Sequence, residues 1–216
     1  MNSQTRREIR FGLITLALSA LLFTLGAALR GPFDLADPAS YIVRTALSPN
    51  YVPGWTLILI GAVLQLYGSF GLYRYLTYRA ENLTAFLALV LRIAGVALAF
   101  PLFTFLAVNA PAIAKLYQQG NQEVTTVFEA YFTSPLGLAL LGVAAVAAIM
   151  GVILFAVTIW RDGRLPKWTA IFFVLGVLLQ SLAAIFAIEL LGLVLFLIST
   201  GMMAWKGWQE SGAETG

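Results

Sequence analysis

The sequence contains no cysteine and no histidine. Without cysteine there is no disulfide, no thiolate nucleophile and no thiolate-bound metal. Without histidine there is no Ser-His-Asp triad, no imidazole proton shuttle and no imidazole ligand for haem or zinc. The sequence also has no Gly-rich phosphate loop, HExxH or GxSxG motif. It therefore predicts a protein that is not an enzyme, with no catalytic residues, no metal site and no cofactor.

Charged residues are scarce as well, at 11% of 216 residues, whereas a soluble domain carries about 25%. Hydrophobic residues make up 60% of the chain, and the mean hydropathy is +0.88. The apolar runs reach the roughly 20 residues that cross a bilayer as a helix, and none alternates as barrel strands do. The 13 basic residues are dispersed, which argues against a nucleic-acid partner. The composition predicts an all-α polytopic membrane protein surrounded by membrane lipids.

The apolar runs predict one domain, residues 1–216, built as a six-transmembrane-helix bundle. The expected spans are about 11–29, 55–74, 84–106, 136–160, 168–186 and 188–205. The last two share one apolar run of 38 residues, which is too long for a single crossing. We expect a turn near Ala187–Glu189, because Glu189 is the only charge in that run. The first apolar stretch is longer than that of a signal peptide, which favours an uncleaved span over a secretory or twin-arginine signal.

The placement of the basic residues predicts the orientation. With the N-terminus inside, three basic residues fall on the outer side, namely Arg30, Arg44 and Lys115. Nine fall on the inner side: Arg6, Arg7, Arg10, Arg74, Arg79, Arg161, Arg164, Lys167 and Lys206. All five tryptophans lie at or near expected span ends, as in an aromatic belt. We therefore expect a protein of the cell membrane with both termini in the cytoplasm.

The two outer loops, about 30–54 and 107–135, are long, and each contains a pattern typical of an amphipathic helix. In the first, Asp37 is expected to cap a helix that starts at Pro38. Its apolar face is Ile42, Val43, Ala46 and Leu47. In the second, residues 123–133 are expected to turn one face to the membrane or the bundle, formed by Val124, Val127, Phe128, Tyr131 and Phe132. Two interpretations stay open: the helices lie among the headgroups, or they cover a cavity between the spans.

Arg92 is the only charged residue in the span expected over 84–106. A guanidinium keeps its charge at any ordinary pH, and in hydrocarbon it costs roughly 2.5–3.5 kcal/mol on insertion scales. At 1.5 Å per residue, Arg92 lies about 12 Å from the inner end of its span. Four neutral polar residues come out at similar depth: Gln65, Ser19, Tyr67 and Ser199. These five residues are the candidate ligand-binding residues.

Glu189 is expected near the outer end of its span, about 24 Å deep, so a salt bridge to Arg92 is not expected. Two interpretations of Arg92 remain. In the structural one, Arg92 reaches toward the inner headgroups or is held by Gln65 and backbone carbonyls. In the functional one, an anionic group such as a lipid phosphate or a fatty carboxylate completes the site. Both the cost of the charge and its depth predict that Arg92 points into the bundle.

The inner loop "RDGRLPKW", residues 161–168, resembles a pattern found in uncharacterised bacterial six-span integral membrane proteins of similar length. In those proteins a basic, Gly-containing loop with a Leu-Pro-basic-Trp sequence precedes a span. The resemblance covers this loop and the general six-span layout. Such families are domains of unknown function, so the resemblance implies a layout and assigns no functional residues.

Three classes of function are compatible with the sequence. The first is a non-enzymatic membrane protein that binds a lipid-like or anionic amphiphilic ligand, or that serves as an accessory subunit beside partner subunits or further copies of itself. The second is a small-solute or ion transporter or channel that uses the Arg92 layer, and the third is an intramembrane enzyme. A closed inner half with an outer cavity favours binding, whereas water-filled access from both sides favours transport. The first class is our prediction.

Overall fold

The computed structural model describes residues 3–32, 38–181 and 185–212, and these residues form eight α-helices and no strand. The helices are α1 (Ser3–Arg30), α2 (Pro38–Thr45), α3 (Tyr51–Thr77), α4 (Leu83–Gln118), α5 (Val124–Thr133), α6 (Pro135–Asp162), α7 (Lys167–Gln180) and α8 (Phe186–Gly212). Five of the described helices, α1, α3, α4, α6 and α8, are long and apolar enough to cross a membrane, whereas α7 has 14 residues. The chain is therefore an all-α, multi-pass integral membrane protein, as its composition predicts.

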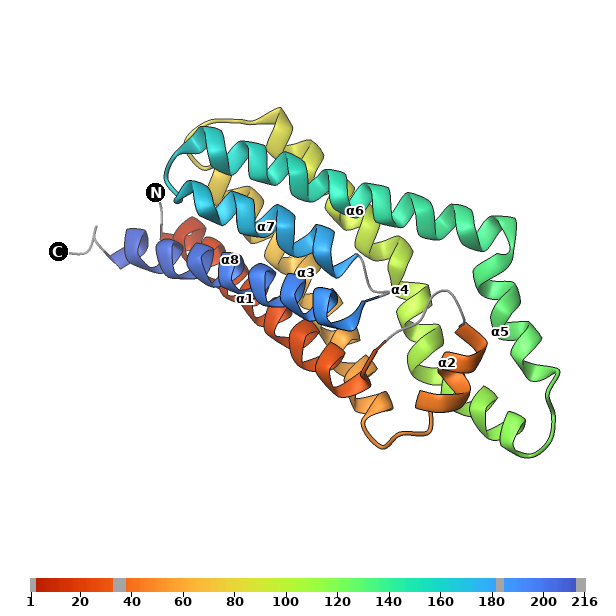
Figure 1. Cartoon of the computed structure of the whole chain (residues 1–216). Helices are drawn as coiled ribbons and strands as arrows, with labels where there is room; N and C mark the ends of the chain where they lie inside the picture. Colours follow the sequence, from red (N-terminus) through yellow and green to blue (C-terminus); the bar gives the residue numbers. More distant parts are fainter. Residues whose placement is uncertain (1–2, 33–37, 182–184, 213–216) are drawn as a thin grey trace.

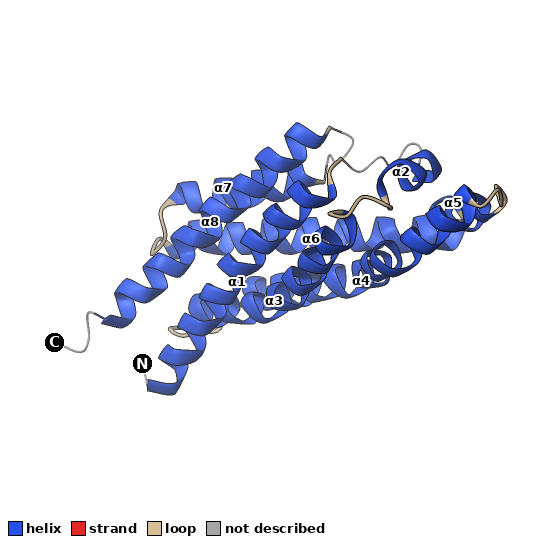
Figure 2. Cartoon of the chain, turned by 90° about the horizontal axis from the view of Figure 1, so that it is seen from below, coloured by secondary structure: helices blue, strands red, loops and turns tan. Residues whose placement is uncertain are grey.

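Six helices, α1, α3, α4, α6, α7 and α8, form a bundle. Each packs against the next one along the chain, and α8 returns to pack against α1, which closes a ring. Helix α1 begins and α8 ends at one end of the bundle, whereas α2 and α5 lie at the other end (Figures 1 and 2). We call the first of these the inner end and the second the outer end.

Helices α1 and α3 meet backbone to backbone at two glycines. A Cβ atom added to Gly12 would lie 2.4 Å from the Cα atom of Gly71, and the reverse distance is also 2.4 Å. Carbon atoms pack at about 3.5–4.0 Å, so neither position has room for a side chain. Close backbone approach of this kind is a main source of helix association in a membrane. Lipid tails are as apolar as the side chains, so moving an apolar side chain from lipid into a helix contact gives little free energy.

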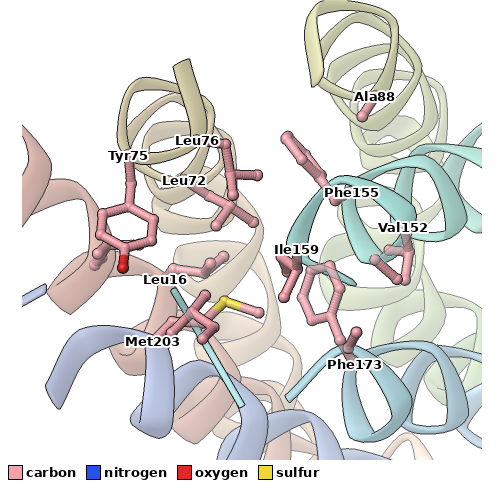
Figure 3. Packing of buried hydrophobic residues seen from close by; sticks show 14 of the residues in the cluster. Leu16, Leu72, Tyr75, Leu76, Ala88, Val152, Phe155, Ile159, Phe173 and Met203 are labelled. Carbon is pink, nitrogen blue, oxygen red and sulfur yellow. The ribbon is translucent and has the colours of Figure 1, made fainter. Parts of the chain in front are cut away.

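The inner half of the bundle is filled by apolar side chains from all six helices, which we call the inner cluster. Figure 3 shows Leu16, Leu72, Ile159, Phe173 and Met203 among the side chains that meet between the helices. The rings of Phe173 and Phe196 stack with their centroids 5.4 Å apart and join α7 to α8. This half is a packed apolar core.

The short inner loop between α6 and α7 is tied to the end of α3 by Arg164. Its guanidinium donates a hydrogen bond of 2.7 Å to the carbonyl of Tyr75 and one of 2.6 Å to the carboxylate of Asp162. It also lies over the rings of Tyr75 and Tyr78, 4.3 and 4.6 Å from their centroids. Burial acts to lower the pKa of Arg164, but the hydrogen bond and charge of Asp162 outweigh burial and raise it.

The break between the last two bundle helices differs from the prediction. The expected turn at Ala187–Glu189 lies inside α8, and α7 ends seven residues earlier, at Gln180. The Ser181 hydroxyl donates to the Val177 carbonyl, 2.8 Å away, at this end. Glu189 stands in the first turn of α8, where the helix dipole favours a carboxylate. The one charge of the run therefore marks a helix start, and α7 is only about 21 Å long.

Helix α4 is longer than predicted, because it continues past the expected span end at 106 to Gln118 and so extends to 36 residues. Its added turns keep one face buried through Ala107, Ala110, Ile113 and Ala114, at the spacing of a helix. At about 54 Å it exceeds the hydrocarbon thickness of a bilayer. Together with α6 it extends beyond the α7–α8 pair toward α2 and α5 (Figure 1).

Both predicted outer helices are present as α2 and α5, and both pack on the bundle. Ile42 of α2 and Ala46 just after it, with Phe128 and Phe132 of α5, are buried in an outer cluster that includes Trp55 and Leu106. The Phe128 ring stacks on Phe105 with centroids 5.6 Å apart. Asp37, the predicted cap of α2, and the side chain of Tyr131 lie outside the described residues.

Two residues of the predicted apolar faces do not follow the prediction. Val127 is 63% exposed and Leu47 is 36% exposed, whereas Val43 and Val124 are half-buried. In α5 the buried face is a narrow stripe that runs through Phe128 and Phe132, which lie four residues apart on the helix. The periodicity therefore found the helix, but it made the buried face too wide.

The glycine contact between α1 and α3 makes a direct prediction. Gly71→Ala should lower the free energy of unfolding by about 1–3 kcal/mol, because the added methyl group overlaps the backbone of Gly12. Gly142→Ala is the matched control, since nothing lies within 4 Å of a Cβ atom there. Thermal unfolding of the purified proteins in detergent measures both changes, and equal shifts in the two variants would contradict this packing.

Candidate functional site

A cavity of about 400 Å³ lies in the outer half of the bundle, between the inner cluster and the outer helices. All six bundle helices, or the residue that follows one of them, contribute to its wall. Its innermost lining residues on the long helices are Phe23, Gln65, Arg92, Ala148 and Leu193. The residues on the inner side of these positions belong to the packed inner cluster, so the cavity is closed toward the inner end.

Arg92 forms part of the inner floor of this cavity. The residue is only 4% exposed, so it points into the bundle, as the sequence predicts. Its guanidinium carbon lies 5.9 Å from the centroid of the Phe196 ring. Within the part of the chain that the structure describes, Arg92 has no ion pair and no hydrogen bond from its side chain. The contact with Phe196 is a cation–π contact, which compensates a buried charge only in part.

Small residues of α6 fix where Arg92 stands. A Cβ atom added to Gly151 would lie 2.8 Å from the backbone nitrogen of Arg92, and one added to Gly95 would lie 2.6 Å from that of Ala148. Helices α4 and α6 therefore touch through their backbones on both sides of Arg92. This contact leaves little freedom for α4 to rotate, so the arginine is held toward the cavity.

The uncharged polar lining of the cavity is sparse. Gln65 is 4% exposed, and its side-chain amide forms no hydrogen bond with another described residue. Gln180 and Ser181 line the cavity at the end of α7. Much of the remaining wall is apolar, formed by residues such as Val96, Leu102 and Ala144. An apolar wall with a few converging polar groups is the usual composition of a ligand-binding cavity.

The outer part of the cavity contains a buried ion pair between Arg30 and Glu189. Both side chains are less than 10% exposed, and Arg30 also donates a hydrogen bond of 2.9 Å to the carbonyl of Gly31. The Arg30 guanidinium lies 5.1 Å from the centroid of the Trp55 ring. Among the described residues that line the cavity, Arg30, Arg92 and Glu189 carry charge.

The burial of the Arg30–Glu189 ion pair shows that two predictions are wrong. Arg30 is not an outer-loop cation, because it ends α1 and is 7% exposed. Trp55 is not part of an aromatic belt, because it is 3% exposed and packs beside Arg30. The prediction that Glu189 does not pair with Arg92 is confirmed, since the carboxylate pairs with Arg30.

Of the five candidate ligand-binding residues, only Arg92 and Gln65 line the cavity. Ser19 is buried within α1, and its hydroxyl donates to the carbonyl of Leu16 at 2.7 Å. Ser199 joins α8 to α7 by donating to the carbonyl of Thr169 at 2.8 Å. Tyr67 of α3 is 61% exposed, and its ring contacts the ring of Phe11 on the surface of the bundle. The five residues lie at similar depth along their spans, but they lie on different faces of their helices, and only two of those faces border the cavity.

Sequence reasoning missed Arg30, Glu189, Gln180 and Ser181 as parts of the site. The charge pattern predicts a loop position for Arg30 and a turn position for Glu189. A usable signal existed for the other two, because Gln180 and Ser181 are an adjacent polar pair within a long apolar run. Such a pair at membrane depth indicates either a helix end or a site.

No family model, curated protein or solved structure matches this chain.

The buried ion pair predicts that replacing both Arg30 and Glu189 costs less stability than the sum of the two single replacements. Glu189→Leu alone should cost about 3–5 kcal/mol of stability, because it removes the carboxylate that pairs with the buried Arg30 guanidinium. The double variant Arg30→Met, Glu189→Leu should recover much of that loss, because neither charge remains. Thermal unfolding of the two single variants and the double variant tests this. A double variant that loses the sum of the two single effects would rule out the pairing.

Proposed function

We propose that this protein binds an anionic amphiphile in the cavity, with the anionic group at Arg92 and the apolar chain along the cavity wall. One observation carries the proposal: a buried arginine, without an ion pair or a side-chain hydrogen bond among the described residues, lines a cavity whose wall is mostly apolar. A buried charge is costly unless it is paired and hydrogen-bonded. A carboxylate, sulfonate or phosphate would supply both the opposite charge and the acceptors, often in bidentate geometry.

The neighbouring groups support the same proposal. The amide of Gln65 is free to donate to an anion beside Arg92, and the amide of Gln180 stands on another wall of the cavity. The apolar walls would gain about 25 cal/mol for each Å² of ligand surface that they remove from water. In a membrane this gain is small, so the charge pairing at Arg92 is the main source of affinity.

The closed inner half favours binding over transport. A transporter or channel needs a polar path through both halves, and the inner cluster fills the inner half with side chains such as Leu16, Phe155 and Phe173 (Figure 3). Binding needs access from one side or from the lipid only. Exposed apolar residues on α6, among them Leu138 and Val146, offer a surface for membrane lipids or for a partner subunit.

We also propose that the protein lies in the cell membrane with its inner end toward the cytoplasm. Because Arg30 is buried in its ion pair, only Arg44 and Lys115 of the outer set remain, against nine basic residues at the inner end. The four exposed tryptophans, Trp160, Trp168, Trp205 and Trp208, all belong to helix segments near that end.

The ligand proposal is tested by replacing Arg92 with a neutral residue. Addition of hexadecyl sulfonate should stabilise the wild-type protein by about 2.7 kcal/mol at one hundred times its Kd. Arg92→Gln should abolish this stabilisation, while the ligand-free variant unfolds no earlier than wild type, because it no longer buries an unpaired charge. Arg74→Gln is the matched control, since Arg74 is exposed and pairs with Glu8 at the surface.

Thermal unfolding in nonionic detergent measures the stabilisation of wild type, Arg92→Gln and Arg74→Gln by the ligand. An Arg92→Gln variant that is stabilised by hexadecyl sulfonate as much as wild type would refute the site. So would a wild-type protein that the sulfonate does not stabilise at all.

The orientation is testable because the sequence has no cysteine, so each introduced thiol is the only one in the protein. Asn121→Cys and Gln209→Cys place thiols at two exposed positions at opposite ends of the bundle. In intact cells a membrane-impermeant maleimide should label position 121 and spare position 209, which should react only after lysis. Labelling of both positions in intact cells would disprove the proposed topology.

A further inference from the structure

We infer that a groove at the inner end of the bundle binds an anionic phospholipid of the surrounding membrane, with the phosphate at Arg7 and one acyl chain along the groove. The groove lies between α1 and α3 and has a volume of about 520 Å³. The described residues that line it all belong to these two helices, and none of them lines the cavity that contains Arg92. The inference is therefore independent of the proposed function.

The apolar part of the groove follows from the glycine contact between α1 and α3. Gly12 and Gly71 both line it, and neither has a side chain to fill the surface where the two backbones touch. Three exposed aromatic residues complete this part of the lining, namely Phe11, Tyr67 and Phe70. Exposed apolar side chains on a membrane-spanning helix face lipid, so an acyl chain is the occupant that this part of the groove fits.

The polar part of the groove lies on the inner side of these rings. Arg7 precedes Phe11 by four residues on α1, and Arg74 follows Phe70 by four residues on α3. Because the two helices are antiparallel, both steps lead about 6 Å toward the inner end. The lining thus changes from apolar to basic in the order in which a phospholipid changes from acyl chain to phosphate.

Arg7 is the guanidinium available to the phosphate. Glu8 accepts a contact of 3.1 Å from Arg74 at one carboxylate oxygen and a hydrogen bond of 3.1 Å from Gln4 at the other. Arg7 is exposed, and among the described residues it has no ion pair and no hydrogen bond from its side chain. A guanidinium binds a phosphate through two parallel hydrogen bonds, so Arg7 can hold the headgroup at the edge of the groove.

The charge of Arg7 predicts a preference between headgroups. One basic side chain near a membrane surface favours an anionic lipid by about fivefold. Phosphatidylcholine carries the same phosphate, but its quaternary ammonium makes the headgroup neutral as a whole. The groove should therefore prefer phosphatidylglycerol, whereas the apolar part of the groove makes the same contacts with both lipids.

Native mass spectrometry of the full-length protein, released from nonionic detergent, tests the headgroup contact. Titration with dioleoyl phosphatidylglycerol and with dioleoyl phosphatidylcholine yields a Kd for the first bound molecule of each. Wild type should bind phosphatidylglycerol about fivefold more tightly. Arg7→Gln should bring the ratio of the two Kd values close to one, and it should do so equally in a protein that also carries Arg92→Gln. Arg161→Gln is the matched control, because Arg161 is exposed at the same end and lies outside the groove.

A second pair of variants tests the acyl-chain contact. Phe11→Ala should raise both Kd values and leave their ratio unchanged, because it removes a wall of the groove and no charge. Phe86→Ala is its control, since Phe86 is exposed on α4 and, like Phe11, packs against one tyrosine ring.

Four outcomes would overturn the inference. The first is a wild-type protein that binds both lipids equally, and the second is an equal loss of preference in Arg7→Gln and Arg161→Gln, which would indicate a general attraction of the basic inner end. The third is a Phe11→Ala variant that binds both lipids as wild type does. The fourth is a dimer that forms without lipid and dissociates in Phe11→Ala, which would assign the groove to a second copy of the chain.

Discussion

The ion pair between Arg30 and Glu189 is the interaction on which the outer half of the bundle depends. It joins the last residue of α1 to the first turn of α8, and so it helps close the ring of helices where the apolar core no longer fills the centre. Two opposite charges in an apolar setting stabilise each other only as a pair, because either one alone carries an uncompensated desolvation cost. The contact therefore holds two chain segments 159 residues apart in one arrangement and defines one side of the cavity.

The two halves of the bundle are built differently for a physical reason. In the inner half, glycines such as Gly12 and Gly71 bring the backbones together, and large apolar side chains fill the space between the helices. In the outer half, α7 ends at Gln180, while α4 and α6 continue to the outer helices (Figure 1). Fewer helices then surround the same axis, and a cavity remains. Arg92 lies at the boundary between the inner and outer halves, with the packed inner cluster on one side and the cavity on the other.

A site residue can be predicted from the sequence when its own chemistry fixes its direction, and it cannot when its neighbours fix it. Arg92 was predictable as an inward-facing residue, because its charge excludes the lipid whatever its neighbours are. Depth along the span selects Gln65, and it also selects Tyr67, which is exposed and does not line the cavity. Depth follows from counting residues along a span, whereas the direction of a side chain depends on which face of the helix meets its neighbours. No periodicity separates these faces in spans that are apolar all round.

The sequence by itself determined the class of the protein: scarce charge and helix-length apolar runs leave no soluble or barrel alternative, and amphipathic patterns located the outer helices. Only the tertiary structure decided that Glu189 pairs with Arg30, that α7 stops early, and that Arg92 faces a cavity instead of a partner. These features depend on which helices become neighbours and at what height, and that choice is made by small-residue contacts such as those of Gly95 and Gly151 across α4 and α6. Contacts of this kind join distant segments and leave no periodic pattern along the chain.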